Sequence, residues 1–397
     1  TCAGWLVGTL MLREYFAHAQ HKNRYYMFWL LTLGATVGVF LSADLFTTFV
    51  CFELMSFTSY VMVVHTETPE AIRAADTYLA VAGICGLVTL TGLFLLWHGA
   101  GTLNIDELYG AVQAAGDSTL IRTAGALTCV GFLAKAGAFP LHIWLPTAHP
   151  VAPAPASGVL SGVIIKSGIF GVLAVSTQVF RFHTLWGTLI FSIGLATMVV
   201  GAVLALFSID FKRTLACSSV SQIGFILTGV GMQCLLGEEG ALAASGTLLH
   251  LFNHASIKLI LFPAAGVIYC FTHTFDLNRI RGFGRRQPWL MAVMAVPMLS
   301  LAGVPGFSGY VSKTLPHEAI VEYIHLRGGS VWFTAAEWIF LLTGGLTVAY
   351  LLKLFAAVFL EPPPPDAPWL GQKNRMSLTS GLTLTVCAAA LLPLGWL

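Results

Sequence analysis

Long apolar stretches, separated by short polar breaks, follow one another along the whole chain. A helix that crosses a bilayer needs roughly 20 predominantly apolar residues, and the breaks fall where glycine, proline and charged residues gather. The pattern predicts twelve spanning helices, with approximate ranges 1–15, 25–42, 44–65, 73–97, 120–146, 153–180, 185–208, 213–236, 242–271, 288–325, 331–360 and 376–397. The predicted fold class is therefore an all-α polytopic membrane protein.

Prolines should interrupt two of these helices. The fifth stretch ends in Phe139-Pro140 and Leu145-Pro146, and the tenth is too long for one straight span and contains Pro305-Gly306. Each proline removes a helical hydrogen bond. We therefore expect one break near Pro140–Pro146 and a second near Val304–Gly309.

Composition supports a membrane location. Hydrophobic residues make up 56% of the chain and charged residues 10%, with a mean hydropathy of +0.80, whereas soluble domains contain about 25% charged residues. The net charge of +2 is carried by scattered residues, which argues against a nucleic-acid partner. The eight cysteines stand singly, without CxxC pairs, so we expect no iron–sulfur cluster, zinc or other cofactor in this chain.

The basic residues between the spans alternate between rich and poor loops, and cytoplasmic loops collect lysine and arginine. One set of alternate loops contains Arg13, Lys22, Arg24, Arg73, Lys212, Arg213, Arg279, Arg281, Arg285, Arg286, Lys373 and Arg375, whereas the opposite set contains Arg122, Arg181 and Arg327. The first set is therefore predicted to be cytoplasmic.

Several charged residues fall inside predicted spans, namely Glu53, Lys135, Lys166, Lys258, Lys313 and Lys353. A charge at membrane depth costs several kcal/mol unless it lines a polar cavity, so these residues indicate an ion path. The alternative for each lysine is that its amine reaches the interface while its stem lies in lipid, and this applies best to Lys353, near a helix end. Glu53 is expected to have a basic partner from another helix.

The ninth predicted helix contains HLFNHASIK, which places His250, His254 and Lys258 at positions i, i+4 and i+8 and so on one face. Histidine can pass protons at physiological pH, so the line suggests a relay. A zinc hydrolase is a weaker alternative, because Leu251 stands where the metalloprotease motif needs glutamate. A third alternative is that the histidines only bond helix carbonyls.

An interrupted helix with a lysine occurs in each half of the chain, with Lys135 before Pro140 and Lys313 after Pro305. Paired interrupted helices are typical of transporters built from inverted repeats. No GxxxxGK[ST] phosphate loop is present, so energy must come from outside this chain.

The sequence resembles the large antiporter-like subunits of respiratory complex I, a family shared with energy-converting membrane-bound hydrogenases and Mrp sodium/proton antiporters. The resemblance rests on the stretches DLFTTFVCFELMSFTSYVMV, FLAKAGAFPLHIWLPTAHPVAPAPASGVLSGVIIKSG, KRTLACSSVSQIGFI, HLFNHASIKLILF and AGVPGFSGYVSKT. It implies one antiporter-like domain over residues 1–397 that lacks the first two of the family's fourteen helices. It also implies two inverted five-helix repeats, at 25–180 and 185–360, and a C-terminal helix at 376–397.

The resemblance further implies that Glu53 pairs with Lys135 and that protons pass along a buried axis. By motif match, this axis comprises Glu53, Lys135, Lys166, His250, His254, Lys258 and Lys313. The implied protein is a non-catalytic, proton-translocating subunit of an NADH:quinone oxidoreductase or hydrogenase type complex in a prokaryotic cytoplasmic membrane. Its implied partners are homologous membrane subunits and a redox module with iron–sulfur clusters and a flavin or nickel–iron site.

An Mrp-type sodium/proton antiporter subunit is the alternative that this resemblance leaves open. The same carboxylates and lysines can serve H⁺ or Na⁺, so the residues do not decide which ion moves. Copurifying subunits would separate the two functions.

Overall fold

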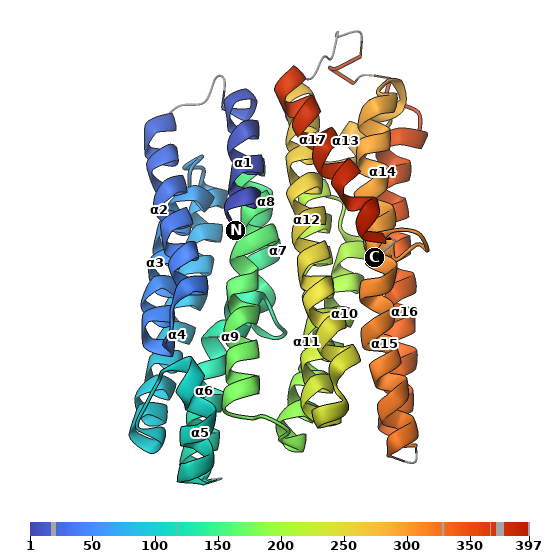
Figure 1. The fold of residues 1–397 in the computed structure, drawn as a ribbon. Helices are drawn as coiled ribbons and strands as arrows, with labels where there is room; N and C mark the ends of the chain where they lie inside the picture. Colours follow the sequence, from blue (N-terminus) through green and yellow to red (C-terminus); the bar gives the residue numbers. More distant parts are fainter. Residues whose placement is uncertain (17–20, 117, 328, 366, 371–376, 396–397) are drawn as a thin grey trace.

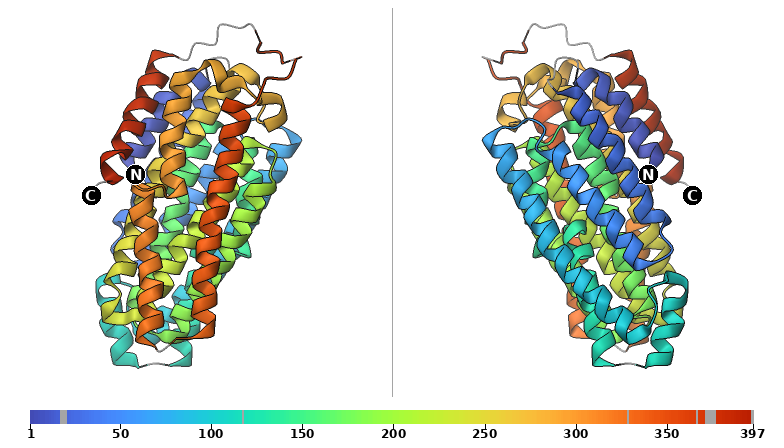
Figure 2. Two further views of the ribbon diagram at one scale, coloured as in Figure 1. Left: turned by 90° about the vertical axis from the view of Figure 1, so that its right-hand side faces the viewer. Right: turned by 90° about the vertical axis from the view of Figure 1, so that its left-hand side faces the viewer.

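The computed structural model describes residues 1–16, 21–116, 118–327, 329–365, 367–370 and 377–395. In this part of the chain, long helices run side by side in a bundle (Figures 1 and 2). Ten helical segments are long and apolar enough to cross a membrane. The expected all-α membrane fold is confirmed.

The helices of the first half are α1 (Cys2–Tyr15), α2 (Lys22–Leu41), α3 (Leu45–Val63), α4 (Pro69–Ala100), α5 (Ile105–Ala115), α6 (Thr119–Ala136), α7 (Leu145–Val151), α8 (Ala154–Val159) and α9 (Ile165–Gln178). Those of the second half are α10 (Thr184–Phe207), α11 (Phe211–Leu236), α12 (Ala241–Thr272), α13 (Leu277–Ile280), α14 (Pro288–Ala302), α15 (Ser308–Leu326), α16 (Val331–Phe355) and α17 (Leu378–Leu391). Single turns of 3-10 or π-helix join or extend several of them.

Each of the twelve predicted stretches contains a helix, but their number as spans is approximate. The structure adds two short helices that hydropathy did not predict, α5 and α13. It also extends the fifth stretch, since α7 continues to Val151 rather than ending at Pro146. Pro146 fits because it stands in the first turn of α7, where the missing N–H is not needed.

Both predicted interruptions are present. The helix α6 ends at Ala136, and Gly137 caps it with a φ of +79°, a left-handed conformation that favours glycine. The helix α14 ends at Ala302, capped by Gly303 with a φ of +81°, and α15 begins at Ser308. A further break at Ala152 and Pro153 separates α7 from α8.

Matching loop pairs occur at opposite ends of the bundle. Asp44 caps α3 and forms an isolated antiparallel bridge with Asn104, directly before α5, while Asp210 caps α11 and bridges Asp276, directly before α13. Figure 1 shows α5 at the lower end of the molecule and α13 at the upper end. The same arrangement, a capping aspartate bridged to the residue before a short helix, therefore occurs in both halves of the chain and at opposite ends of the bundle.

Close packing places α11 at the centre of the molecule, where nearly all of its residues are buried. Glycines let it approach α10, because a Cβ added at Gly201 or Gly224 would collide with the backbone of the facing helix.

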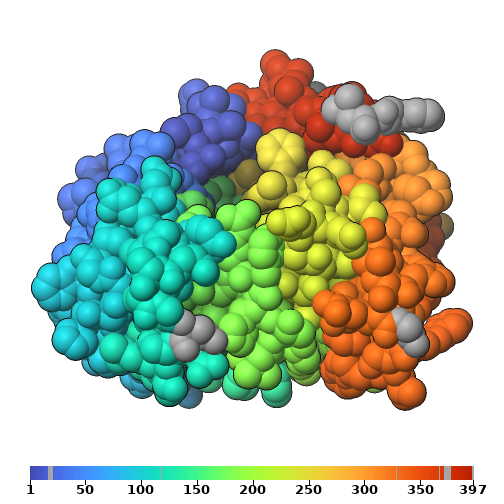
Figure 3. Space-filling model, turned by 60° about the horizontal axis from the view of Figure 1, so that its bottom comes forward, coloured from blue at the N-terminus to red at the C-terminus, as the bar shows by residue number. Residues whose placement is uncertain are grey.

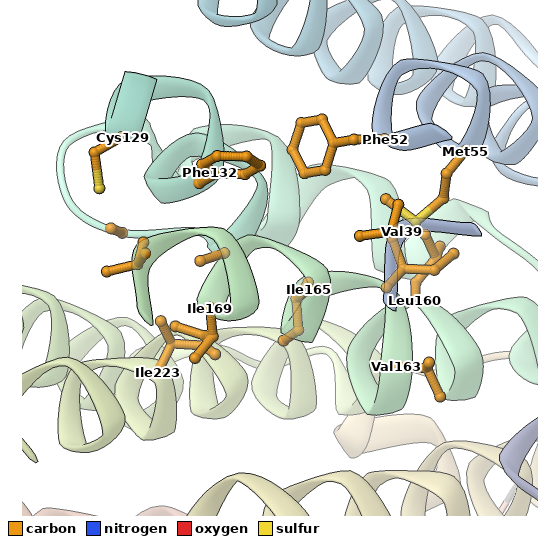
Figure 4. Packing of buried hydrophobic residues seen from close by; sticks show 14 of the residues in the cluster. Val39, Phe52, Met55, Cys129, Phe132, Leu160, Val163, Ile165, Ile169 and Ile223 are labelled. Carbon is orange, nitrogen blue, oxygen red and sulfur yellow. The ribbon is translucent and has the colours of Figure 1, made fainter. Parts of the chain in front are cut away.

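In the first half, Phe52 and Phe132 pack with ring centroids 5.1 Å apart (Figure 4). At the upper edge, the Glu14 carboxylate accepts hydrogen bonds from Ser377, which ties α1 to the start of α17 (Figure 2).

Candidate functional site

Six of the seven predicted site residues lie buried in the interior. Lys135, Lys166, His250, His254, Lys258 and Lys313 are all at most 9% exposed, and Glu53 is half-buried. They come from α3, α6, α9, α12 and α15, so tertiary packing gathers groups that lie far apart in sequence. A buried cation is tolerated only where polar groups replace its water, and each lysine has such groups.

Lys135 stands in the last turn of α6, directly before the break. Its amine donates to the Tyr78 hydroxyl at 2.8 Å and lies 4.5 Å from the centre of the same ring. The Tyr78 oxygen is in turn 2.6 Å from the Ser59 hydroxyl. The carbonyl end of a helix favours a cation, so the break and the tyrosine together hold this amine.

Glu53 does not form the expected direct ion pair with Lys135. Its Oε1 has no hydrogen-bond partner among the described residues, and no Lys135 nitrogen lies within 4.0 Å of the carboxylate. The carboxylate instead lies against α4, where a Cβ at Gly86 would come within 2.6 Å of Oε1. The reason for the difference is that Tyr78, which the sequence analysis missed, takes the lysine amine.

Lys166 and His254 meet directly, with Nζ and Nδ1 2.8 Å apart. The Lys166 amine also donates to the Ser161 carbonyl at 2.5 Å. This carbonyl belongs to a π-helical turn, Leu160–Ile164, that precedes the lysine. Such turns are rare and often occur at functional sites, because they displace backbone groups from regular helical bonding.

The histidines of α12 continue this line. His250 and His254 have nearly parallel rings with centroids 6.4 Å apart, which confirms that they share a helix face. His250 Nδ1 lies 3.0 Å from the Ser312 hydroxyl and its Nε2 3.1 Å from Gln222 Oε1. The histidines thus bond side chains of other helices rather than helix carbonyls. Among the described residues, no group of three or more histidine, cysteine and acidic side chains could hold a metal ion.

Polar side chains of α11 connect these groups. Lys258 donates to the Ser218 hydroxyl and to the Leu215 carbonyl, and Ser219 lies 2.7 Å from Ser161. Gln222 links His250 to the Tyr350 hydroxyl. The sequence analysis used this stretch as a family signature but assigned it no role. The polar run Cys217–Gln222 inside an otherwise apolar helix was the available signal.

Lys212 and His149 are two further buried groups that the sequence analysis missed. Lys212 was expected in a cytoplasmic loop, but it is fully buried and its amine donates to the Pro150 and Ala152 carbonyls at the break after α7. His149 is also fully buried and is stacked on Phe262, and neither of its ring nitrogens has a hydrogen-bond partner within the described part of the chain. The prediction for Lys212 failed because composition does not distinguish the last residues of a loop from the first turn of the helix that follows it.

Lys313 and Lys353 bind freed carbonyls at helix ends. The Lys313 amine donates to the Leu301 carbonyl in the last turn of α14 at 2.7 Å and lies 4.9 Å from the Phe225 ring. Lys353, for which an amine at the interface and a place on the ion path both stayed open, donates to the carbonyls of Ala205, Leu206 and Ser208 at the end of α10. Lys353 is therefore a helix cap.

Comparisons with known proteins agree with this architecture. The chain is 29% identical over 401 residues to hydrogenase-4 component B of Escherichia coli, covering 97% of this chain and 58% of that protein. It is 29% identical over 341 residues to one of the proteins that make up an Na⁺/H⁺ antiporter of Alkalihalophilus pseudofirmus, covering 86% and 66%. The chain thus spans less than two thirds of each relative.

A solved structure shows the same fold over nearly the whole chain. A chain of the membrane-bound sulfane sulfur reductase, described as an archaeal respiratory membrane complex, superposes with a TM-score of 0.86 at 25% identity, covering 98% of this chain and 62% of that one. The family model described as NADH:quinone oxidoreductase/Mrp antiporter, TM matches residues 42–336. This match covers most of the chain, which is therefore an integral membrane protein of the NADH:quinone oxidoreductase/Mrp antiporter family.

Proposed function

We propose that this chain is the proton-translocating, antiporter-like subunit of a redox-driven membrane complex. The observation that carries the proposal is the buried contact between Lys166 and His254 at 2.8 Å. Two bases that share one hydrogen at this distance can exchange a proton with little movement. Lys258 and His250 lie one turn away on either side of His254, so the contact stands in the middle of a line.

The proposed axis uses all seven predicted residues. Glu53 and Lys135 form the first proton-binding site of the axis, in the first half of the chain. Lys313 forms the last one. The central site consists of Lys166 and the α12 face, with His250, His254 and Lys258. A proton arriving at Lys166 raises the cost of a proton on Lys258, because like charges in a low-dielectric interior repel. Binding of a proton at one of these sites therefore favours release of a proton from the neighbouring site.

The paired devices of the fold support two inverted repeats, over residues 25–180 and 185–360. Each contains a capped start with a loop bridge, from Asp44 and from Asp210, and each contains a helix broken beside a lysine. In inverted-repeat transporters the ion path lies between the repeats, with broken helices opening from opposite sides. Lys135 and Lys313 take equivalent places in this scheme.

The driving event is proposed to lie in partner subunits. The similarity to a hydrogenase component and to a chain of a respiratory membrane complex supports a redox module carrying iron–sulfur clusters and a flavin or nickel–iron site. Homologous membrane subunits would pack against the broad apolar surface, which includes Ile84, Leu87 and Phe94 of α4. The similarity to an Na⁺/H⁺ antiporter protein supports the alternative, an Mrp-type antiporter.

The copurifying subunits distinguish a redox-driven complex from an Mrp-type antiporter. The full complex, isolated in mild detergent from its native membrane and analysed by mass spectrometry, is expected to contain iron–sulfur proteins. A complex of antiporter subunits alone would overturn the redox assignment in favour of the Mrp alternative.

Translocation itself is tested in proteoliposomes containing the complex. Lys166→Met should lower proton movement per turnover by about two orders of magnitude, as expected when a proton-transfer group is lost. Lys22→Met is the matched control, because this lysine lies at the start of α2, away from the axis. Parent-like proton movement by Lys166→Met would overturn the proposed function.

A further inference from the structure

The helix α15 is unusually polar for its position in a membrane bundle. It lies among helices that meet the criteria for a membrane span, yet it does not meet them itself. Along it stand Lys313, His317, Glu318, Glu322 and His325. Ionisable residues at membrane depth face a polar cavity or one another. We call these five residues the polar stripe, and we expect it to lie along a polar passage between the interior and the surface.

The contacts of the stripe reach α16. His317 Nε2 lies 3.4 Å from the Glu337 carboxylate and His317 Nδ1 lies 3.6 Å from Glu318. Lys313 is buried, whereas the side chains of His317 and Glu337 are 20% and 26% exposed. The groups therefore form a graded line from the interior to the surface.

The inner end of this line joins the axis. Ser312, the residue before Lys313, bonds His250. Pro316 lies inside α15 and cannot donate to the Ser312 carbonyl, so a backbone acceptor is freed between Lys313 and His317. Aromatic rings cover the same interval: Phe225 lies under the Lys313 amine, Phe340 packs on Phe225 at 4.8 Å, and His317 lies 5.9 Å from Phe340.

We propose that His317 and Glu337 form the proton outlet of this chain, leading from Lys313 to the face opposite the arginine-rich loops; this inference rests on the proposed function. A proton leaves the Lys313 ammonium and binds the His317 imidazole, giving a neutral amine and an imidazolium. The imidazolium N–H then passes it to the Glu337 carboxylate, which releases it to water and regenerates both groups.

The outlet is short. Glu337 is six residues from the start of α16, or about 9 Å along the helix, and His317 is nine residues from the end of α15, or about 13 Å. Figure 3 shows the lower face, where the orange surface of α15 and α16 forms one edge of the molecule. The released proton therefore has only about two helical turns of protein to cross.

A purely structural ion pair between α15 and α16 is the competing explanation, and the variants below separate it from a relay. His317 Nε2 is buried and makes no hydrogen bond with any residue that the structure describes, although Glu337 is 3.4 Å away. A relay requires this nitrogen and the carboxylate to come within hydrogen-bond distance when the proton is passed.

Water access tests the outlet without relying on translocation. His317→Cys and Leu342→Cys are compared in sealed vesicles of each orientation, using a membrane-impermeant cationic methanethiosulfonate and the parent chain as background for native cysteines. Leu342 is the matched control, because it lies at similar depth and is 65% exposed on the apolar outer surface of α16. His317→Cys should react at least about tenfold faster, and only from the lower face, because thiolates form where water reaches.

Proton movement per turnover tests the relay. His317→Gln and Glu337→Gln keep a side chain of similar size that can form hydrogen bonds, but glutamine cannot titrate. Both variants should therefore lower proton movement per turnover by about tenfold or more in the assembled complex. Glu318→Gln, which alters the more exposed carboxylate beside His317, should leave it within about twofold. If Lys166→Met abolishes proton movement while both outlet variants move protons normally, or if His317→Cys does not react, the outlet is wrong and the proposed function stands.

Discussion

Lys166 and His254, 88 positions apart in sequence, lie with Nζ and Nδ1 2.8 Å apart in a site that is closed to solvent. Since Nδ1 accepts in one state and donates in the other, the pair can hold one proton in either of two places. The Ser161 carbonyl accepts from the amine, whereas His254 Nε2 has no hydrogen-bond partner among the described residues. One hydrogen can pass between these two nitrogens, as the proposed relay requires.

Replacing His254 with glutamine should separate hydrogen bonding from titration. The amide oxygen can still accept from Lys166, but it cannot take the proton, so His254→Gln should lower proton movement per turnover by about tenfold to a hundredfold. Assembly should be unchanged, as measured by complex yield. Parent-like proton movement would show that His254 only positions the lysine.

The first proton-binding site predicts a graded series. Lys135→Ala and Glu53→Gln should each remove most of the ion-coupled activity, because a titratable group is lost. Tyr78→Phe keeps both groups and deletes only the hydroxyl that receives the Lys135 amine, at a cost of about 1.5–3 kcal/mol for a bond to a charged group. It should therefore give an intermediate rate in proteoliposomes. Normal rates for all three would make the Lys135 and Tyr78 contact structural.

Lys313 should tolerate a change of charge better than a loss of titration. Lys313→Glu keeps a group that can bind and release a proton beside the break, whereas Lys313→Met fills a similar volume without one. We expect Lys313→Glu to retain the larger share of proton movement per turnover, with equal complex yield for both. Equal and near-normal values would remove Lys313 from the relay.

Lys353 should matter for stability and not for transport. Its amine satisfies three carbonyls at the end of α10, and leaving a buried acceptor unsatisfied costs about 1–3 kcal/mol. Lys353→Met should therefore lower the thermal midpoint and the yield of the complex. Proton movement per assembled complex should match the parent, and a loss there would place Lys353 on the axis.

His65 should make the upper face sensitive to acid. Burial, followed by the Arg24 charge, lowers its pKa from 6.5, with a further lowering by His21 and an opposing effect of Glu67. The unfolded chain then binds a proton that the folded chain does not, so stability falls as pH drops below 6.5. His65→Phe keeps a ring beside Phe16 and Tyr25 without titrating. Its thermal midpoint should fall less than the parent's between about pH 7.5 and about pH 5.5, whereas parallel falls would exclude His65 as the cause.

Sequence by itself determined the long helices, the two proline breaks and the positions of Lys135, Lys166, Lys258, Lys313 and Lys353 inside spans. These features are local: a bilayer demands about 20 apolar residues in a row, and a proline disrupts the helix that contains it. The line of His250, His254 and Lys258 was equally predictable, because one helix fixes their spacing. The breaks predicted near Pro140–Pro146 and Val304–Gly309 are local as well, and the structure adds that Gly137 and Gly303 cap the helices before them.

Only the tertiary structure decided which groups meet. Hydropathy averages a whole segment and does not say how each helix is rotated toward its neighbours, so the sequence paired Lys135 with Glu53 when Tyr78 holds the amine. The same limit placed Lys212 in a loop, although the break after α7 faces it and supplies the Ala152 carbonyl. A hydrogen bond between helices depends on both partners reaching within about 3 Å with the right angle, and that condition is set by packing around α11, which hydropathy does not encode.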